Sequence, residues 1–225
     1  MRRALIVWGG WEGHDPENVA TVFRDLLAEN GFEVTLADSL EAFNDAEKLK
    51  LLDLIVPVWT GGQITAEQLS AVTEAVGSGT GLAGCHGGMC DAFRSSPQWQ
   101  FLTGGNWVAH PGGGDVTYTV NICNSSSTIV QGIGDFEVTS EQYYLHVDPA
   151  VEVLATTRFP APETTGWHTT NGAVDVPVVW TKRWGKGRVF YISLGHDASI
   201  VSMKPVLEIA RRGFLWAAEG KQRTE

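Results

Sequence analysis

The sequence predicts an α/β protein, a three-layer sandwich whose central sheet is mostly parallel. Up to residue 90, short apolar runs typical of strands buried on both faces alternate with amphipathic helical patterns. Such an alternation implies parallel strands with helices on both faces of the sheet. The chain has 225 residues and shows neither an internal repeat nor a linker, so we expect a single domain over residues 1–225.

The first strand is predicted over residues 4–8, an apolar run that leads into a flexible loop over residues 9–15. Asp15 is expected to cap the helix that follows, because Pro16 occupies the first helical position; Gly31 ends this helix. The alternation then continues with strand 32–36, strand 51–59, a helix from the cap Thr65 to Val76, and strand 81–84.

The second half of the chain is less regular. The glycine-rich stretch 104–114 is expected to be a mobile loop, and the stretch 158–175 is expected to be loop as well. A hairpin of strands 176–181 and 188–194, followed by a helix over residues 205–218, closes the chain. The other predicted elements are a short helix at 97–102 and strands at 115–122, 136–138 and 151–155.

Two reactive residues, Cys85 and His86, follow strand 81–84 among small neighbours. This pattern is typical of a strand-to-helix elbow, where glycines permit a tight turn and one side chain projects from the end of the strand. Gly84 and Gly88 bracket the histidine, whereas an elbow centred on the cysteine would need a glycine at position 83, which is alanine. We therefore expect His86 at the apex and Cys85 facing the sheet.

All six histidines lie outside the predicted elements: His14, His86, His110, His146, His168 and His196. Three of them, His14, His86 and His196, follow predicted strands, so they are expected to share one pocket at the carboxyl edge of the sheet. We predict that these three act in acid–base catalysis together with Asp197. The same three imidazoles are alternatively candidate ligands of a divalent metal such as zinc, with Asp15, Glu141 or Asp197 as the carboxylate.

Several tryptophans also fall in predicted loops, where aromatic rings near a pocket serve binding more often than packing. Their flat faces and N–H donors suit sugar rings. The predicted substrate-binding residues are Trp11, Trp59, Trp107, His110, Glu141 and Trp184.

The composition excludes several classes of protein. A formal net charge of −10 argues against nonspecific binding of nucleic acid. No apolar run reaches the roughly 20 residues that span a bilayer, and the N-terminus leads directly into a strand rather than a signal sequence. Three cysteines without a CxxC pair indicate no disulfide framework. We expect a cytoplasmic protein with a small-molecule partner and no nucleic-acid or membrane partner; a homo-oligomer is left open.

Several motifs resemble those of the ThuA-like, or trehalose-utilisation, family. The most specific is the block at residues 185–197, GKGRVFYISLGHD, and further matches are Gly13-His14, Gly84-x-His86-x-Gly88 and the Trp107…His110-Pro111 stretch. The resemblance covers nearly the whole chain. It implies a flavodoxin-like fold similar to that of class I glutamine amidotransferases.

In those amidotransferases a cysteine stands at the elbow tip, and a histidine and a glutamate follow a late strand. Here His86 takes the nucleophile position and His196 that of the triad histidine, while Ala198 stands where the glutamate would be. An imidazole can act as a base or a ligand, but it cannot form the thioester of the amidotransferase mechanism. The departure therefore removes that mechanism.

The resemblance implies carbohydrate metabolism, linked to the processing of 3-keto disaccharides beside a sugar dehydrogenase. A ketone at C3 acidifies the C2 proton, so a base can remove it, the glycosidic oxygen can leave, and water can add back. We expect an enzyme of the 3-keto-glycoside lyase or hydrolase type that uses histidine acid–base or metal-assisted chemistry. Two alternatives stay open: a non-catalytic sugar-binding or regulatory module, and a cysteine-dependent amidase that uses Cys85 or Cys90.

Overall fold

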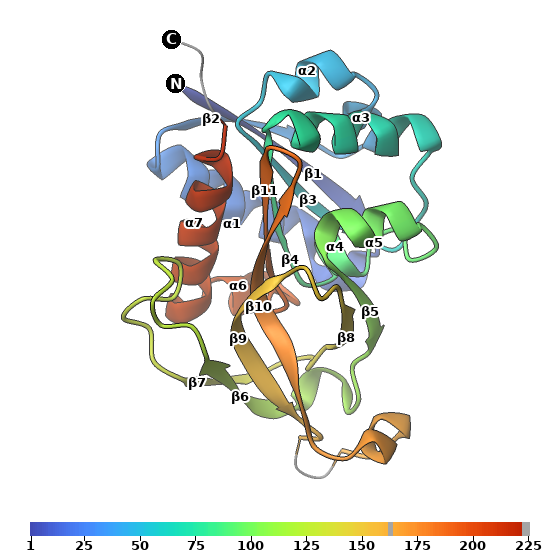
Figure 1. The fold of residues 1–225 in the computed structure, drawn as a ribbon, viewed down its shortest axis with the longest axis vertical. Coiled ribbons are helices and arrows are strands. Elements are labelled where there is room, and N and C mark those ends of the chain that lie inside the picture. Colours follow the sequence, from blue (N-terminus) through green and yellow to red (C-terminus); the bar gives the residue numbers. More distant parts are fainter. Residues whose placement is uncertain (162–163, 222–225) are drawn as a thin grey trace.

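The computed structural model describes residues 1–161 and 164–221, which form two sheets and the helices around them (Figure 1). The strands are β1 (Arg2–Gly10), β2 (Phe32–Ala37), β3 (Leu54–Thr60), β4 (Gly81–Cys85), β5 (Gly105–Ala109), β6 (Thr117–Ile122), β7 (Phe136–Thr139), β8 (Tyr144–Val147), β9 (Glu152–Phe159), β10 (Val174–Trp184) and β11 (Gly187–Ile192). The larger sheet has nine strands in the order β2-β1-β3-β4-β11-β10-β9-β6-β7, and the smaller sheet pairs β5 with β8.

The nine-stranded sheet has a parallel half and an antiparallel half. All pairs from β2 to β11 are parallel. All pairs from β11 to β7 are antiparallel. The predicted parallel core is thus confirmed, and the antiparallel strands extend it into a mixed sheet.

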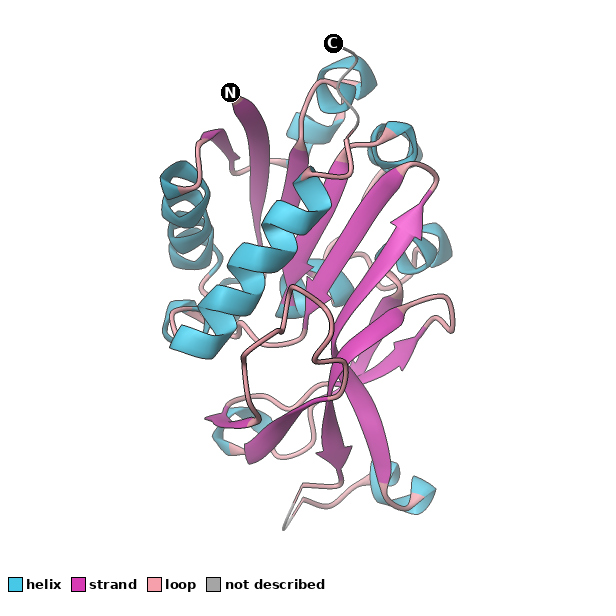
Figure 2. Ribbon diagram, turned by 60° about the vertical axis from the view of Figure 1, so that its left-hand side comes forward, coloured by secondary structure: helices cyan, strands magenta, loops and turns pink. Residues whose placement is uncertain are grey.

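Helices lie on both sides of the strands, which makes three layers (Figure 2). The α-helices are α1 (Pro16–Glu29), α2 (Ala46–Lys50), α3 (Ala66–Ser78), α4 (His86–Cys90), α5 (Pro97–Thr103), α6 (Ala198–Val201) and α7 (Lys204–Ala218); short 3-10 helices are η1 (Glu12–His14), η2 (Leu40–Phe43), η3 (Gly113–Asp115) and η4 (Trp167–Asn171). Among the described residues, no helix is both long and apolar enough to cross a membrane.

Each layer buries one stripe of helical side chains against the sheet. On one face α1 packs beside α7, with Phe23 edge-to-face against Phe214 at 4.8 Å between ring centroids. On the other face α3 buries Leu69, Val72 and Val76 at helical spacing. Because both faces are covered, strands β3 and β4 are almost entirely buried, as their apolar runs predicted.

The predicted strands and helices of the first 90 residues are present. The helix over residues 65–76 is α3, and Thr65 and Gln68 form a reciprocal capping box at its start. Asp15 is the N-cap residue of α1, as predicted, but its side chain accepts no hydrogen bond from the amides of this helix. It accepts one from the Asn18 side chain instead, at 2.7 Å.

The middle of the chain is more regular than its glycines suggested. The predicted mobile loop at 104–114 contains strand β5, which pairs with β8. Gly105 lies in this strand at a point of close approach, where a Cβ atom would come within 2.8 Å of the buried Trp180 ring. Within the predicted loop 158–175, β9 continues to Phe159 and η4 forms, whereas residues 162–163 lie outside the described part.

Candidate functional site

The elbow after β4 brings His86 to the carboxyl edge of the sheet. This residue has φ +46°, a left-handed conformation that costs a non-glycine residue about 1–3 kcal/mol and clusters at functional sites. The elbow needs a glycine at position 88, because a Cβ atom there would lie only 2.9 Å from the Val58 backbone of β3. Cys85 is buried in the core below, against Gly195. The histidine is therefore at the apex, and the cysteine faces the sheet, as predicted.

The hydrogen bonds of His86 determine its tautomer. Its Nδ1 lies 2.7 Å from the carbonyl oxygen of Ser193 and must donate, so the proton of the neutral ring is on Nδ1. Burial lowers the pKa of His86 to about 4 despite the opposing contact with Glu141. The Nε2 lone pair of the neutral ring thus faces Glu141 Oε2 at 3.1 Å. Two lone pairs at this distance repel each other unless a cation lies between them or beside them.

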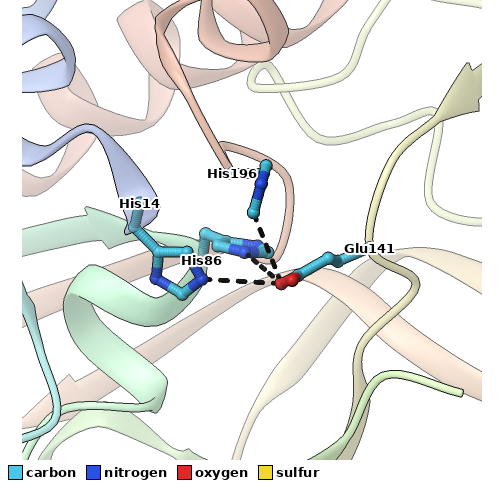
Figure 3. A group of neighbouring side chains, drawn as sticks. All are labelled: His14, His86, Glu141 and His196. Carbon is cyan, nitrogen blue, oxygen red and sulfur yellow. Dashed lines mark hydrogen bonds and ion pairs between the residues drawn. The ribbon is translucent and has the colours of Figure 1, made fainter. Parts of the chain in front are cut away.

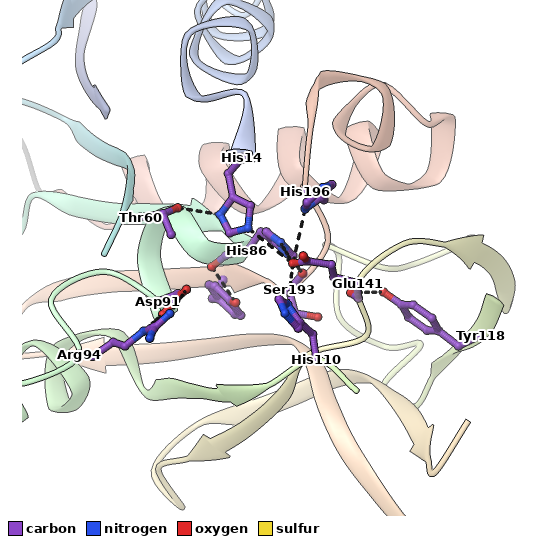
Figure 4. A network of polar contacts seen from close by, with 11 residues as sticks. His14, Thr60, His86, Asp91, Arg94, His110, Tyr118, Glu141, Ser193 and His196 are labelled. Carbon is purple, nitrogen blue, oxygen red and sulfur yellow. Dashed lines mark hydrogen bonds and ion pairs between the residues drawn. The ribbon is translucent and has the colours of Figure 1, made fainter. Parts of the chain in front are cut away.

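Three further imidazoles approach the same carboxylate oxygen, those of His14 and His196 (Figure 3) and that of His110 (Figure 4). Glu141 Oε2 lies 3.5 Å from His14 Nε2, 3.4 Å from His196 Nδ1 and 2.9 Å from His110 Nδ1. The rings of His14, His86 and His196 are within 5.6 Å of one another, centroid to centroid. The structure therefore brings together the three histidines that were expected to share a pocket, and it adds His110.

Glu141 stands at the centre of this cluster although it belongs to no strand or helix. It is 6% exposed, and its backbone oxygen accepts a hydrogen bond from the Tyr118 hydroxyl at 3.1 Å (Figure 4). Burial acts to raise the pKa of Glu141, but its close contacts with His110 and the other three imidazoles outweigh it, and the pKa is held well below its ordinary value. The side chain is therefore an anion among imidazoles.

The donor set fits a divalent metal. One ligand atom each from His14, His86, Glu141 and His196 lies within 4.8 Å of all the others. Within the described residues, His14 Nε2 and His196 Nδ1 are buried without a hydrogen-bond partner. His14 Nδ1 contacts Thr60 Oγ1 at 2.8 Å, so His14 and His86 both have the outer hydrogen bonds that orient metal-binding imidazoles. Three imidazoles and one carboxylate can hold an ion of the zinc type.

A cavity of about 310 Å³ opens beside the cluster. Its lining residues are Trp11, His14, Thr60, Gly61, Asp91, Arg94, Trp107 and His110. The predicted substrate-binding residues Trp11, Trp107 and His110 therefore lie around one space, next to the cluster. Asp91 and Arg94 were not predicted, because nothing in the sequence after the elbow indicates that the chain returns to the cavity.

Other predicted site residues lie elsewhere. The Asp197 carboxylate caps α6, accepting hydrogen bonds from the Ser199 and Ile200 amides, and it is not a member of the cluster. Trp184 pairs with Gly187 at the start of β11, at the end of the strands opposite to the histidine cluster. Trp59 lies at the end of β3 with its ring against Gly9 and Gly62, outside the cavity lining.

Some tryptophans and one histidine that were predicted in loops lie in strands. Trp107 and Trp184 lie in strands β5 and β10 rather than in loops, and His146 lies in β8. Trp59 lies in β3, within the predicted strand 51–59. Strand pairing, which local sequence does not encode, accounts for these differences.

Fold and cluster together define an α/β protein of the class I glutamine amidotransferase-like type that carries a histidine at the elbow position. The chain belongs to the ThuA trehalose-utilisation family, whose model matches residues 3–217. None of the curated proteins compared with the chain matches it.

Solved structures share the fold at low sequence identity. A ThuA-like protein from Bacteroides uniformis is 20% identical with a TM-score of 0.77, covering 96% of this chain and 91% of that one. Another from Parabacteroides merdae is 19% identical with a TM-score of 0.74, covering 100% and 92%. A β-galactosidase from Bacillus circulans is 14% identical with a TM-score of 0.61; the match covers 96% of this chain but 30% of that protein.

Proposed function

We propose that this protein is a carbohydrate-processing enzyme that cleaves a 3-keto disaccharide or related glycoside, with a divalent metal such as zinc held by the cluster. One observation carries the proposal: the imidazole nitrogens of His14, His86 and His196 converge on a single buried Glu141 oxygen. Family membership in trehalose utilisation supports the substrate class. Such a site beside a cavity with aromatic walls suits a sugar whose oxygen atoms must be oriented.

A metal is favoured over a proton on His86 as the charge that stabilises the cluster. Protonation of His86 on Nε2 would also relieve its repulsion with Glu141, but burial lowers the pKa of this imidazole to about 4. A bound ion supplies positive charge beside the cavity, where negative charge develops on the ketone oxygen of the substrate. The residues themselves position the donors and exclude water from the cluster.

His110 is the residue we assign to proton transfer. It borders the cavity, and its side chain is 36% exposed, so it is more accessible than His14 or His86. Its imidazole would accept the C2 proton, and the electron pair of the C2–H bond would form a C1=C2 double bond as the glycosidic oxygen leaves C1. The protonated ring would then give the proton to that oxygen. Water would add across the double bond, its oxygen to C1 and a proton to C2.

The test combines metal analysis with turnover. Protein purified without chelator is expected to contain about one zinc-type ion per chain, the number that one four-ligand site holds. It should release glucose from 3-keto-trehalose, lose this activity with chelator and regain it with added zinc. Metal-free protein that is fully active would refute the metal assignment, and sugar binding without turnover under every metal would favour a binding module.

A pair of variants separates the ligand role from the proton-transfer role. His110→Ala should lower turnover by about 10²-fold or more while the metal content stays unchanged. His14→Ala should lower the metal content as well. Equal loss of metal in both variants would contradict the division of roles.

The cysteine alternative loses support from burial. Cys85 is fully enclosed, and desolvation raises its pKa to about 12, while burial also raises the pKa of Cys90. A thiol needs to ionise near neutral pH to act as a nucleophile. Alkylation of the native protein is therefore expected to leave turnover intact.

A further inference from the structure

We propose that Asp91 and Arg94 form a subsite in the cavity that binds the hydroxyl groups of a neutral sugar ring, with Trp11 as the stacking surface. The inference deepens the proposed function and rests on it for the identity of the site. It adds that the recognised ring is uncharged, and it names the residues that select it. In Figure 4, Asp91 and Arg94 lie on the side of the cluster away from Tyr118.

The guanidinium of Arg94 is held in one plane by two contacts. Its Nε and Nη2 both donate to the Asp91 carboxylate, the Nη2–Oδ2 distance being 2.9 Å. Its Cζ atom lies 4.1 Å from the centre of the Trp107 ring. Asp91 is 3% exposed, so this paired carboxylate is a buried anchor rather than a surface ion pair. A fork-shaped ion pair that also stacks on an indole is preorganised for directional hydrogen bonds.

The residue before Arg94 has an unfavourable backbone conformation, and the chain there turns back to the cavity. Phe93 has φ +48° although it is a bulky buried residue, which is unfavourable unless the surroundings enforce it. Gly61, at the end of β3, donates its N–H to the Asp91 carbonyl oxygen at 2.9 Å and accepts from the Phe93 N–H at 3.1 Å. These bonds bring the chain back from α4 to the edge of the sheet, where Arg94 joins the cavity lining.

One edge of the guanidinium is left for a ligand. Within residues 1–161 and 164–221, Arg94 Nη1 has no hydrogen-bond partner, and the Arg94 side chain is 53% exposed. The hydrogen bonds to Asp91 raise the pKa of Arg94, so the group stays charged, yet the adjacent carboxylate neutralises it. A neutralised fork offers N–H donors to hydroxyl oxygens without the excess positive charge that would select a phosphate or carboxylate.

The aromatic walls of the cavity have different roles. One face of Trp107 is covered by the guanidinium of Arg94. Trp11 lines the cavity and is 54% exposed, although Gly13 packs against its ring and His14 contacts it at 4.7 Å between ring centroids, so about half of its surface is open to a ligand. A volume of about 310 Å³ lies at the lower end of the roughly 300–1,000 Å³ typical of small-molecule sites. The space therefore suits one sugar ring rather than an extended chain.

The experiment measures binding of sugars that carry no ketone, so that turnover does not interfere. Trehalose, glucose and glucose 6-phosphate are titrated calorimetrically against the metal-loaded protein. The wild type should bind the neutral sugars in preference to glucose 6-phosphate. Arg94→Gln and Arg94→Lys should each weaken the binding of neutral sugars by about tenfold or more, because a lysine ammonium cannot reproduce the fork. Arg183→Gln, an exposed arginine on β10 at the far edge of the sheet, is the matched control and should bind like the wild type.

Asp91→Asn provides a gain-of-binding test. This variant removes the neutralising charge, so Arg94 should gain affinity for glucose 6-phosphate and inorganic phosphate, and the gain should weaken as salt is added. Thermal melts verify that each variant is folded, and Arg94→Lys keeps the charge if Arg94→Gln is unstable.

Three results would overturn the subsite: unchanged sugar binding by the Arg94 variants, preference of the wild type for the phosphorylated sugar, or no binding of neutral sugars by the wild type. Turnover of 3-keto-trehalose is measured separately. Turnover without binding of neutral sugars would overturn the subsite and leave the proposed function standing. Sugar binding that depends on Arg94, without turnover, would leave the subsite standing and refute the proposed function.

Discussion

The two halves of the large sheet contribute to the site in different ways. The parallel half supplies His14, His86 and His196, each just beyond the carboxyl end of a strand. The antiparallel half and the β5–β8 ribbon supply Glu141 and His110, from segments between strands. Neither half has a complete cluster. Parallel strand ends thus provide the imidazoles of His14, His86 and His196, whereas the anion that completes the site comes from the less regular part of the chain.

The largest effect is expected where the antiparallel half completes the cluster. Glu141→Gln keeps the size of the side chain but removes the anion, so the imidazoles lose their shared partner and the metal its charged ligand. Turnover should fall on the order of 10³-fold, and the metal content should fall with it. Metal analysis and a turnover assay measure both. Glu137→Gln, on β7 of the same half, is an exposed control that should behave like the wild type.

The elbow tests the contribution of the parallel half. His86→Ala should reduce turnover of a keto-sugar by at least about 10²-fold while the fold stays intact. Cys85→Ser should keep most activity and lose about 1–2 kcal/mol of stability, because a hydroxyl enters an apolar site. Kinetics and thermal unfolding measure the two effects. An inactive Cys85→Ser beside a nearly wild-type His86→Ala would mean that thiol chemistry operates at the elbow.

Two tryptophans at opposite ends of the strands of the large sheet can be compared. Trp11→Ala should weaken binding of trehalose by about tenfold, the loss of roughly 1.4 kcal/mol of aromatic contact. Trp184→Ala should leave the affinity unchanged, because this residue lies at the opposite edge, near Gly77. Calorimetric titration measures both. A larger loss in Trp184→Ala would contradict the placement of the sugar beside the cluster.

The smallest effect is expected on stability, from an ion-pair group on α7 that also contacts the segment before β7. Glu208 of α7 pairs with Arg211 and Arg212, and Arg212 also donates to the backbone oxygen of Gln131 in the segment before β7. The hydrogen bond from Arg211 lowers the pKa of Glu208 to about 2 from its ordinary 4.5. A lowered pKa stabilises the fold above pH 4.5, and the stabilisation is lost as the pH falls toward 2.

Glu208→Gln should therefore lower the free energy of unfolding by about 1 kcal/mol or less at pH 7, because partly exposed pairs are screened by water. The difference from the wild type should shrink below pH 4.5 and disappear near pH 2. Urea unfolding at several pH values measures it. A difference that is independent of pH would show that packing, and not charge, accounts for the effect.

The parallel core of the sheet could be predicted from the sequence alone. The strands β1, β3 and β4 are apolar in sequence because both of their faces are buried. A capping box marks the first turn of helix α3. The glycines at 84 and 88 identified His86 as the apex of the elbow. Strand ends in a parallel sheet share one edge, so the meeting of His14, His86 and His196 followed from topology alone.

The rest of the site depends on contacts between distant parts of the chain. The glycines at 104 and 105 do not predict a strand, yet β5 begins there. It is stabilised by pairing with β8, some 40 residues further along the chain. Asp197 and Glu141 are both acidic residues in irregular segments, and local sequence does not distinguish the one that caps a helix from the one that receives four imidazoles. The position of Arg94 depends likewise on a strained backbone and on two bonds to Gly61. Such long-range pairings determine which side chains meet, and no local pattern encodes them.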